Sequence, residues 1–131
     1  MDTTIKITFC WSLIIIGFIF HTQYELSGLF FGEDIKMPKA DGEMPYSAHY
    51  FNILVHIIPL FFALLTLFFN NKIFKIVSLM YAGLLLLLNV FHLVATGAEN
   101  IFNLSQMFLL TFITVVNILL TVSINKWRKI I

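Results

Sequence analysis

The stretch that decides the fold is residues 50–96, which read YFNILVHIIPLFFALLTLFFNNKIFKIVSLMYAGLLLLLNVFHLVAT. It holds two apolar runs, 50–69 and 73–96, and the only charged residues in it are Lys72 and Lys75. A transmembrane helix needs about 20 mostly apolar residues to cross a hydrocarbon layer of roughly 30 Å. The stretch therefore predicts two consecutive transmembrane helices joined by a short turn.

Two further apolar runs lie outside this stretch, one from about residue 7 to 23 or 26 and one from 101 to 124. Neither alternates with the period of two that a membrane strand would show, and helices satisfy their own backbone hydrogen bonds in lipid. We therefore predict an all-α fold, an integral membrane bundle of four transmembrane helices. The spans are about 7–26, 50–69, 73–96 and 101–124 of a single domain, 1–131.

The first run is predicted to be a retained helix rather than a cleaved signal peptide. Only Lys6 precedes it as a basic residue, and bulky Phe18, Ile19 and Phe20 stand where a cleavage site needs small side chains.

The composition agrees with a protein that sits in lipid. Hydrophobic residues make up 60% of the chain and charged residues 11%, with a mean hydropathy of +0.93. Soluble domains carry about 25% charged residues. A net charge of +1 without a basic stripe argues against a nucleic-acid partner. Cys10 is the only cysteine, which excludes an internal disulfide.

The basic residues predict the orientation. Six of the eight fall on the side of the termini and of the turn between the second and third spans: Lys6, Lys72, Lys75, Lys126, Arg128 and Lys129. The other side holds Lys36 and Lys39 among acidic residues. By the positive-inside rule we expect both termini in the cytoplasm.

The one long connection, residues 27–48, is expected to be a solvated loop rather than a substrate lid. Its apolar patch at Leu29, Phe30 and Phe31 suits the membrane interface, and Pro38 and Pro45 discourage a helix.

All four histidines fall in the half of the bundle that this orientation makes the outer one. They come from three predicted helices: His21, His49, His56 and His92. Helical spacing places further polar residues beside them, such as Glu25 four residues after His21, and Asn89 three residues before His92. Polar side chains at this depth face the bundle interior, so we expect a polar pocket there.

Imidazole and carboxylate are the ligands that transition metals take, and histidine also titrates near neutral pH. We therefore expect His21, Glu25, His56 and His92 to bind a metal ion or to handle protons, with Asn or Gln side chains as supporting partners. A haem held between His56 and His92 is a less favoured alternative.

A plainer interpretation stays open beside this one. Histidine is tolerated at the membrane interface, which would account for His21 and His49, and buried Asn and Gln often serve as contacts between helices. No HExxH motif supports the metal.

The His21–Glu25 pair on the first of four spans is similar to the EXPERA domains of sterol-isomerase-like membrane proteins. Only that pair and the number of spans match, so the similarity assigns no residue a role.

Three function classes follow from these observations. The first is a small polytopic membrane protein with a His/Glu site for a metal ion or protons. The second is an accessory or structural subunit of a larger membrane complex or homo-oligomer. The third is a membrane enzyme that uses His and Glu as acid and base on a lipid or quinone.

Overall fold

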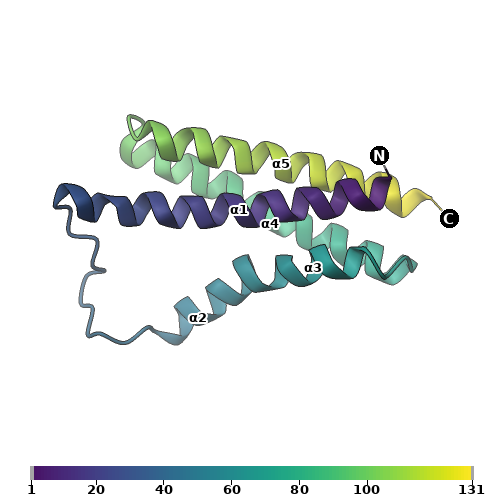
Figure 1. Cartoon of the computed structure of the whole chain (residues 1–131), viewed down its shortest axis with the longest axis horizontal. Helices are drawn as coiled ribbons and strands as arrows, with labels where there is room; N and C mark the ends of the chain where they lie inside the picture. Colours follow the sequence, from purple (N-terminus) through teal and green to yellow (C-terminus); the bar gives the residue numbers. More distant parts are fainter. Residues whose placement is uncertain (1, 131) are drawn as a thin grey trace.

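The computed structural model describes residues 2–130, which are helical along most of their length (Figure 1). Four segments are long and apolar enough to cross a membrane: Thr3–Phe31, Tyr46–Thr66, Lys72–Asn100 and Leu104–Lys129. The described residues include no strand. The predicted all-α fold with four membrane-spanning helices is therefore confirmed.

The elements follow one another as α1 (Thr3–Ser27), the 3₁₀ turn η1 (Gly28–Phe31), α2 (Tyr46–Asn52), the π-helical turn η2 (Ile53–Ile57), α3 (Ile58–Thr66), α4 (Lys72–Asn100) and α5 (Leu104–Lys129). Together α2, η2 and α3 form the second span.

The helix ends differ from the predicted span ends in all four spans, and α4 and α5 show how. The third span was expected to end at residue 96 and the fourth to begin at 101, but α4 continues to Asn100 and α5 begins at Leu104. Helix α4 continues past its apolar run because the helix extends through the polar interface, whereas α5 begins three residues inside its predicted run. Asn103 accepts a hydrogen bond from the backbone N–H of Gln106 and so caps α5 at its observed start.

Helix α5 packs along both α1 and α4, and α3 packs against α1. Figure 1 shows the two termini and the α3–α4 turn at one end of the bundle, here called the termini end. The connection 32–45 and the α4–α5 turn lie at the other end, here called the loop end. Helix α2 splays away from α1 as it approaches the loop end.

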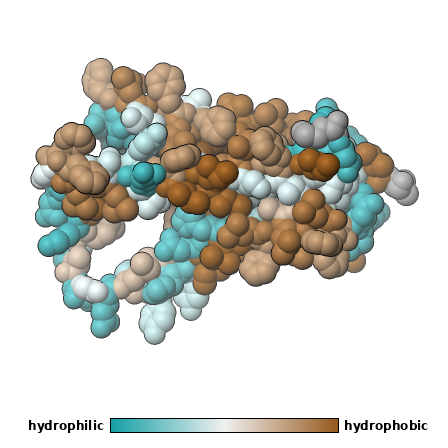
Figure 2. Space-filling model, in the orientation of Figure 1, coloured by the Kyte–Doolittle hydropathy of each residue, from teal (hydrophilic) through white to brown (hydrophobic). Residues whose placement is uncertain are grey.

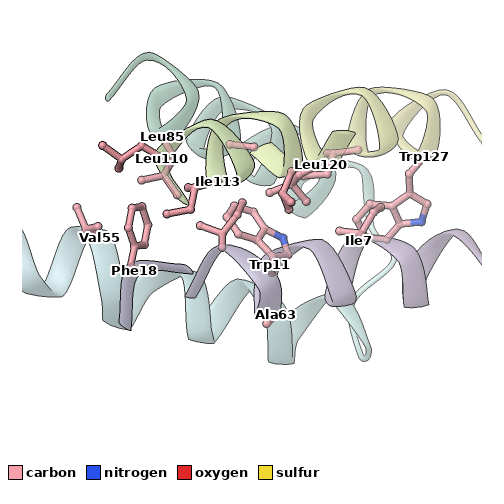
Figure 3. Close-up of a cluster of buried hydrophobic side chains, with 14 residues drawn as sticks. Ile7, Trp11, Phe18, Val55, Ala63, Leu85, Leu110, Ile113, Leu120 and Trp127 are labelled. Atoms are coloured by element: carbon pink, nitrogen blue, oxygen red, sulfur yellow. The ribbon is translucent and has the colours of Figure 1, made fainter. Parts of the chain in front are cut away.

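Regularly spaced side chains form the packed seams between the helices (Figure 3). On α5 the buried residues alternate in steps of four and three: Gln106, Leu110, Ile113, Asn117, Leu120, Ile124 and Trp127. On α1 the same steps connect Ile7, Trp11, Ile14 and Phe18. This repeat keeps one face of each helix against its neighbour over several turns. In lipid the gain comes from close packing rather than from removal of water.

Aromatic rings join α3 to α1 and α4 in the half of the bundle near the termini. The Phe62 ring stacks on Trp11 at 5.4 Å, on Tyr81 at 4.9 Å and on Phe74 at 5.8 Å between ring centroids. Offset stacking at such distances is favourable beyond simple area burial. The wide side chains therefore fill the space between α3 and α4.

The second span is irregular at η2, one turn before Pro59. The N–H of Ile58 donates to the carbonyl of Ile53, five residues back, instead of to Leu54. Because Pro59 has no N–H, the Leu54 carbonyl has no donor from either residue. The Tyr81 hydroxyl of α4 donates to that carbonyl. A backbone irregularity in the span is thus satisfied from a neighbouring helix, as membrane helices require.

The surface matches a lipid environment around the middle of the bundle. Figure 2 shows hydrophobic side chains over the central part of this face and most hydrophilic ones towards its two ends. Many of the large apolar residues are exposed, among them Phe61, Met80 and Phe108. A lipid bilayer is the solvent that makes such exposure favourable.

Candidate functional site

The seams of the bundle change from apolar to polar at the loop end. After Phe18, the next step of three along α1 reaches His21, and a further step of four reaches Glu25. On α4 the buried positions Ala82, Leu85 and Asn89 continue to His92 with the same spacing. The repeat that packs the core therefore delivers His21 and His92 to the bundle interior.

The two imidazole rings meet there directly. The Nε2 atoms of His21 and His92 lie 2.9 Å apart, and the rings are edge-to-face with centroids 4.8 Å apart. One nitrogen must carry a proton and the other must accept it, because this distance is a hydrogen bond. The pair links α1 to α4 across the loop end.

Gln106 at the start of α5 determines which His21 nitrogen carries a proton. Its Nε2 donates to the His21 carbonyl oxygen at 3.2 Å, since a carbonyl can only accept. Its Oε1 therefore faces His21 Nδ1, 2.6 Å away, and accepts a hydrogen bond from it. Gln106 is buried, so water does not compete for these bonds. In the neutral ring, His21 Nε2 is then the acceptor and His92 Nε2 the donor.

Glu25 stands beside the histidine pair on the same face of α1. Its Oε1 lies 3.3 Å from His21 Nε2, and its side chain is 59% exposed whereas that of His21 is 13% exposed. The carboxylate thus connects the buried pair to the open side of the bundle. An added proton on His21 would place a positive charge next to this carboxylate.

His56 and His49 take different places. His56 lies in η2, and its ring meets the Phe18 ring edge-to-face with centroids 5.8 Å apart. Among the described residues its ring forms no hydrogen bond with the His21–His92 pair. His49 is exposed and lies beside the Tyr46 ring. Of the four residues predicted as ligands, the structure joins His21, Glu25 and His92 by contacts and leaves His56 apart.

Within residues 2–130, no three His, Cys, Asp or Glu side chains are arranged to hold a metal ion. The hypothesis of a transition metal at His21, Glu25, His56 and His92 stays a prediction, and so does the haem. The observed contacts instead form a chain of hydrogen-bond donors and acceptors from His92 through His21 to Gln106.

A polar cavity of about 520 Å³ opens beside the pair at the loop end. Its walls include three carboxylates from separate segments, namely Glu25 of α1, Glu33 of the connection and Glu99 of α4. His21 and His92 form part of the same wall. Acidic side chains around a mouth raise the local concentration of cations, protons included.

A second cavity, of about 540 Å³, lies between α1, the α2–η2 segment and α4; we call it the lateral cavity. It shares His21, Thr22, Glu25 and His92 with the polar cavity, and His56 and Asn89 also line it. The histidine pair therefore borders two cavities of different character.

Sequence reasoning did not give Glu33 a place in the site. Glu33 follows η1, and its backbone N–H donates to the Gly28 carbonyl, which turns the chain back towards α1. A Cβ at Gly28 would clash with the Glu33 carboxylate. No periodicity marks a loop residue, so only the fold could place it. Gln106, in contrast, could have been found from the four-and-three spacing along α5.

No protein-family model, curated protein or solved structure matches the chain at a significant level.

Proposed function

We propose that this membrane protein takes up and releases a proton at the paired histidines His21 and His92, with Glu25 as the counter-charge. The observation that carries the proposal is the 2.9 Å contact between the two Nε2 atoms, with the His21 tautomer set by Gln106. Histidine is the side chain whose ordinary charge change lies near neutral pH.

The contact has a defined response to protons. With both rings neutral, one proton between the Nε2 atoms makes the hydrogen bond. When His21 takes up a proton, its Nε2 becomes an N–H that can donate to Glu25 Oε1. His92 Nε2 must then either lose its own proton and accept, or turn away from His21. With both rings charged, two N–H donors and two positive charges face each other, so the contact breaks.

The surroundings supply a route and a charge balance for this proton. The charged groups around the pair are Glu25 on α1, Glu33 on the connection and Glu99 on α4. All three line the polar cavity, and no lysine or arginine of residues 2–130 lines it. Uptake of a positive charge is therefore favoured at the mouth, where all three glutamates are exposed to water.

The proposal includes an orientation with the termini in the cytoplasm and the histidine pair towards the opposite side. It is supported by the basic residues of the termini end, where Lys72, Lys75, Arg128 and Lys129 line one cavity of about 800 Å³. Clusters of this sign are typical of the cytoplasmic side.

Nitrogen NMR of isotopically labelled histidine side chains in lipid nanodiscs tests the proposal. Titrated from about pH 8 to about pH 5, His21 and His92 should change together in two coupled steps. In a His92→Gln variant, His21 should titrate in a single step. The coupling should survive unchanged in His49→Gln, because His49 is exposed and outside the pair.

A His21 titration curve that is the same in the wild type and in His92→Gln would contradict the proposal. Metal analysis of the purified protein runs beside the titration. If the wild type contains stoichiometric metal and His21→Gln does not, the site binds a metal ion as first predicted, and the proton-handling proposal is wrong.

A further inference from the structure

The lateral cavity has the walls of a binding site for an apolar molecule. Phe18 and Val55 line it from α1 and η2, and Leu85 lines it from α4; the three approach one another at one end of the core (Figure 3). At its rim stand Phe51 and Phe91, which are 55% and 72% exposed. Both rim residues belong to membrane-spanning helices, so this rim faces lipid, whereas the opposite wall is shared with the polar cavity.

One buried polar group in the wall of the cavity has no partner among residues 2–130. Asn89 is 5% exposed and lines the cavity, yet its Nδ2 has no hydrogen-bond acceptor among residues 2–130. An unpaired buried donor costs about 1–3 kcal/mol. An occupant that brings an acceptor atom would remove this cost.

The lining also restricts the charge of the occupant. Among the described residues, Glu25 is the only charged side chain that lines the cavity, and no lysine or arginine is present. An anionic headgroup would therefore meet a carboxylate and no cation. The polar end offers the Asn89 amide and the rings of His56 and His92, which suit a neutral oxygen acceptor.

We infer that the lateral cavity binds a neutral, membrane-soluble ring carbonyl of the quinone type, with a carbonyl oxygen at the Asn89 amide. A volume of about 540 Å³ suits a substituted ring and the first part of its tail. The aromatic walls at Phe18, Phe51 and Phe91 suit a flat ring, and the tail leaves through the lipid-facing rim. His92 belongs both to this wall and to the histidine pair. The inference therefore deepens the proposed function and rests on it for the role of the histidine pair. Quinone binding itself does not require the proposed function.

Binding of decylubiquinone to the purified full chain in nanodiscs tests the inference, with decylbenzene as a probe of similar tail without carbonyl groups. The quinone should bind and decylbenzene should bind much more weakly. Asn89→Leu should weaken quinone binding roughly tenfold, as expected for one lost hydrogen bond. The same substitution at exposed Asn70, at the termini end, should leave binding unchanged.

Asn89→Leu should remain folded, because an apolar side chain of similar size replaces an amide whose donor is unpaired. Leu88→Trp, which narrows the cavity while keeping the Asn89 amide, should also weaken binding. Equal binding of the two probes, or full binding by Asn89→Leu, would overturn the inference.

The coupled histidine titration separates the two proposals. Asn89→Leu should lose the quinone and keep the coupled titration of His21 and His92. His92→Gln should lose the coupling. Absent quinone binding with intact coupling overturns the inference alone, whereas quinone binding without coupling overturns the proposed function alone.

Discussion

At the scale of single residues, Gly17 sets the approach of α1 to α5. A Cβ placed on Gly17 would lie 2.5 Å from Cγ1 and 2.9 Å from Cδ1 of Ile113. Ile113 is fully buried, so its side chain has little room to move aside. Small residues at helix contacts allow this closeness in membranes. The absent side chain therefore stabilises the seam just below the histidine pair.

Gly17→Ala should lower the stability of the bundle by about 1–3 kcal/mol, the cost of overpacking a filled core. Thermal unfolding in mild detergent, followed by circular dichroism, measures the effect. Gly83→Ala on α4 is the matched control, because a Cβ there meets nothing within 4 Å. A Gly17→Ala protein as stable as Gly83→Ala would show that α1 and α5 are not held this closely.

The residues of the candidate site differ in how far the sequence could predict them. The sequence placed His21, Glu25 and His92 on interior faces by spacing alone, and the structure joins these three by contacts. His56 had the same spacing argument but faces the Phe18 ring instead. Spacing identifies a face of a helix, whereas a partner across the bundle depends on how neighbouring helices are rotated and spaced.

At the scale of elements, the π-helical turn η2 is the feature that shapes the lateral cavity. It lies between α2, which splays away at the loop end, and α3, which packs against α1. The sequence alone shows Pro59 and its missing N–H, from which a kink is expected at this level of the span. It did not predict the extra residue in the turn. Nor did it predict that the Tyr81 hydroxyl of α4 would donate a hydrogen bond to the Leu54 carbonyl.

Tyr81→Phe should destabilise the protein by about 1–3 kcal/mol, because the part-buried Leu54 carbonyl then has no donor within a membrane-spanning segment. The substituted side chain keeps an aromatic ring that can stack on Phe62, so the loss reports the hydroxyl alone. Thermal unfolding measures stability, and the His56 resonances report the change at η2.

Tyr50→Phe is the control for this substitution, since Tyr50 is 69% exposed on the same span as η2. Equal stability of Tyr81→Phe and Tyr50→Phe would mean that the Tyr81 hydroxyl does not support η2.

At the scale of the whole molecule, an even number of spans places both termini at one end (Figure 1). The basic cavity lies at that end, while the polar cavity and its three glutamates lie at the other. This separation of charge supports the proposed orientation.

A green fluorescent protein fused to the C-terminus should therefore fluoresce in the cytoplasm, and alkaline phosphatase fused there should be inactive. Alkaline phosphatase inserted into the connection 32–45 should be active. The reverse pattern would place the histidine pair on the cytoplasmic side and overturn the proposed orientation.

The sequence by itself determined the fold class, the four spans and the half of the bundle that carries the histidines. Each of these follows from local properties, namely run length, helical period and the position of charges along one chain. The end of α4 at Asn100 lay beyond its reach, because the polar interface permits helix without an apolar signal, and the start of α5 at Leu104 is set by the Asn103 cap.

Only the tertiary structure decided which polar groups meet. It brought His21 to His92, placed Gln106 on the His21 ring and left the Asn89 amide nitrogen beside the lateral cavity without an acceptor among residues 2–130. These contacts join α1, α4 and α5 across 71 and 85 positions of the chain. Such contacts depend on side-chain volumes along whole helix seams, since close packing sets the rotation and spacing of each helix against its neighbours.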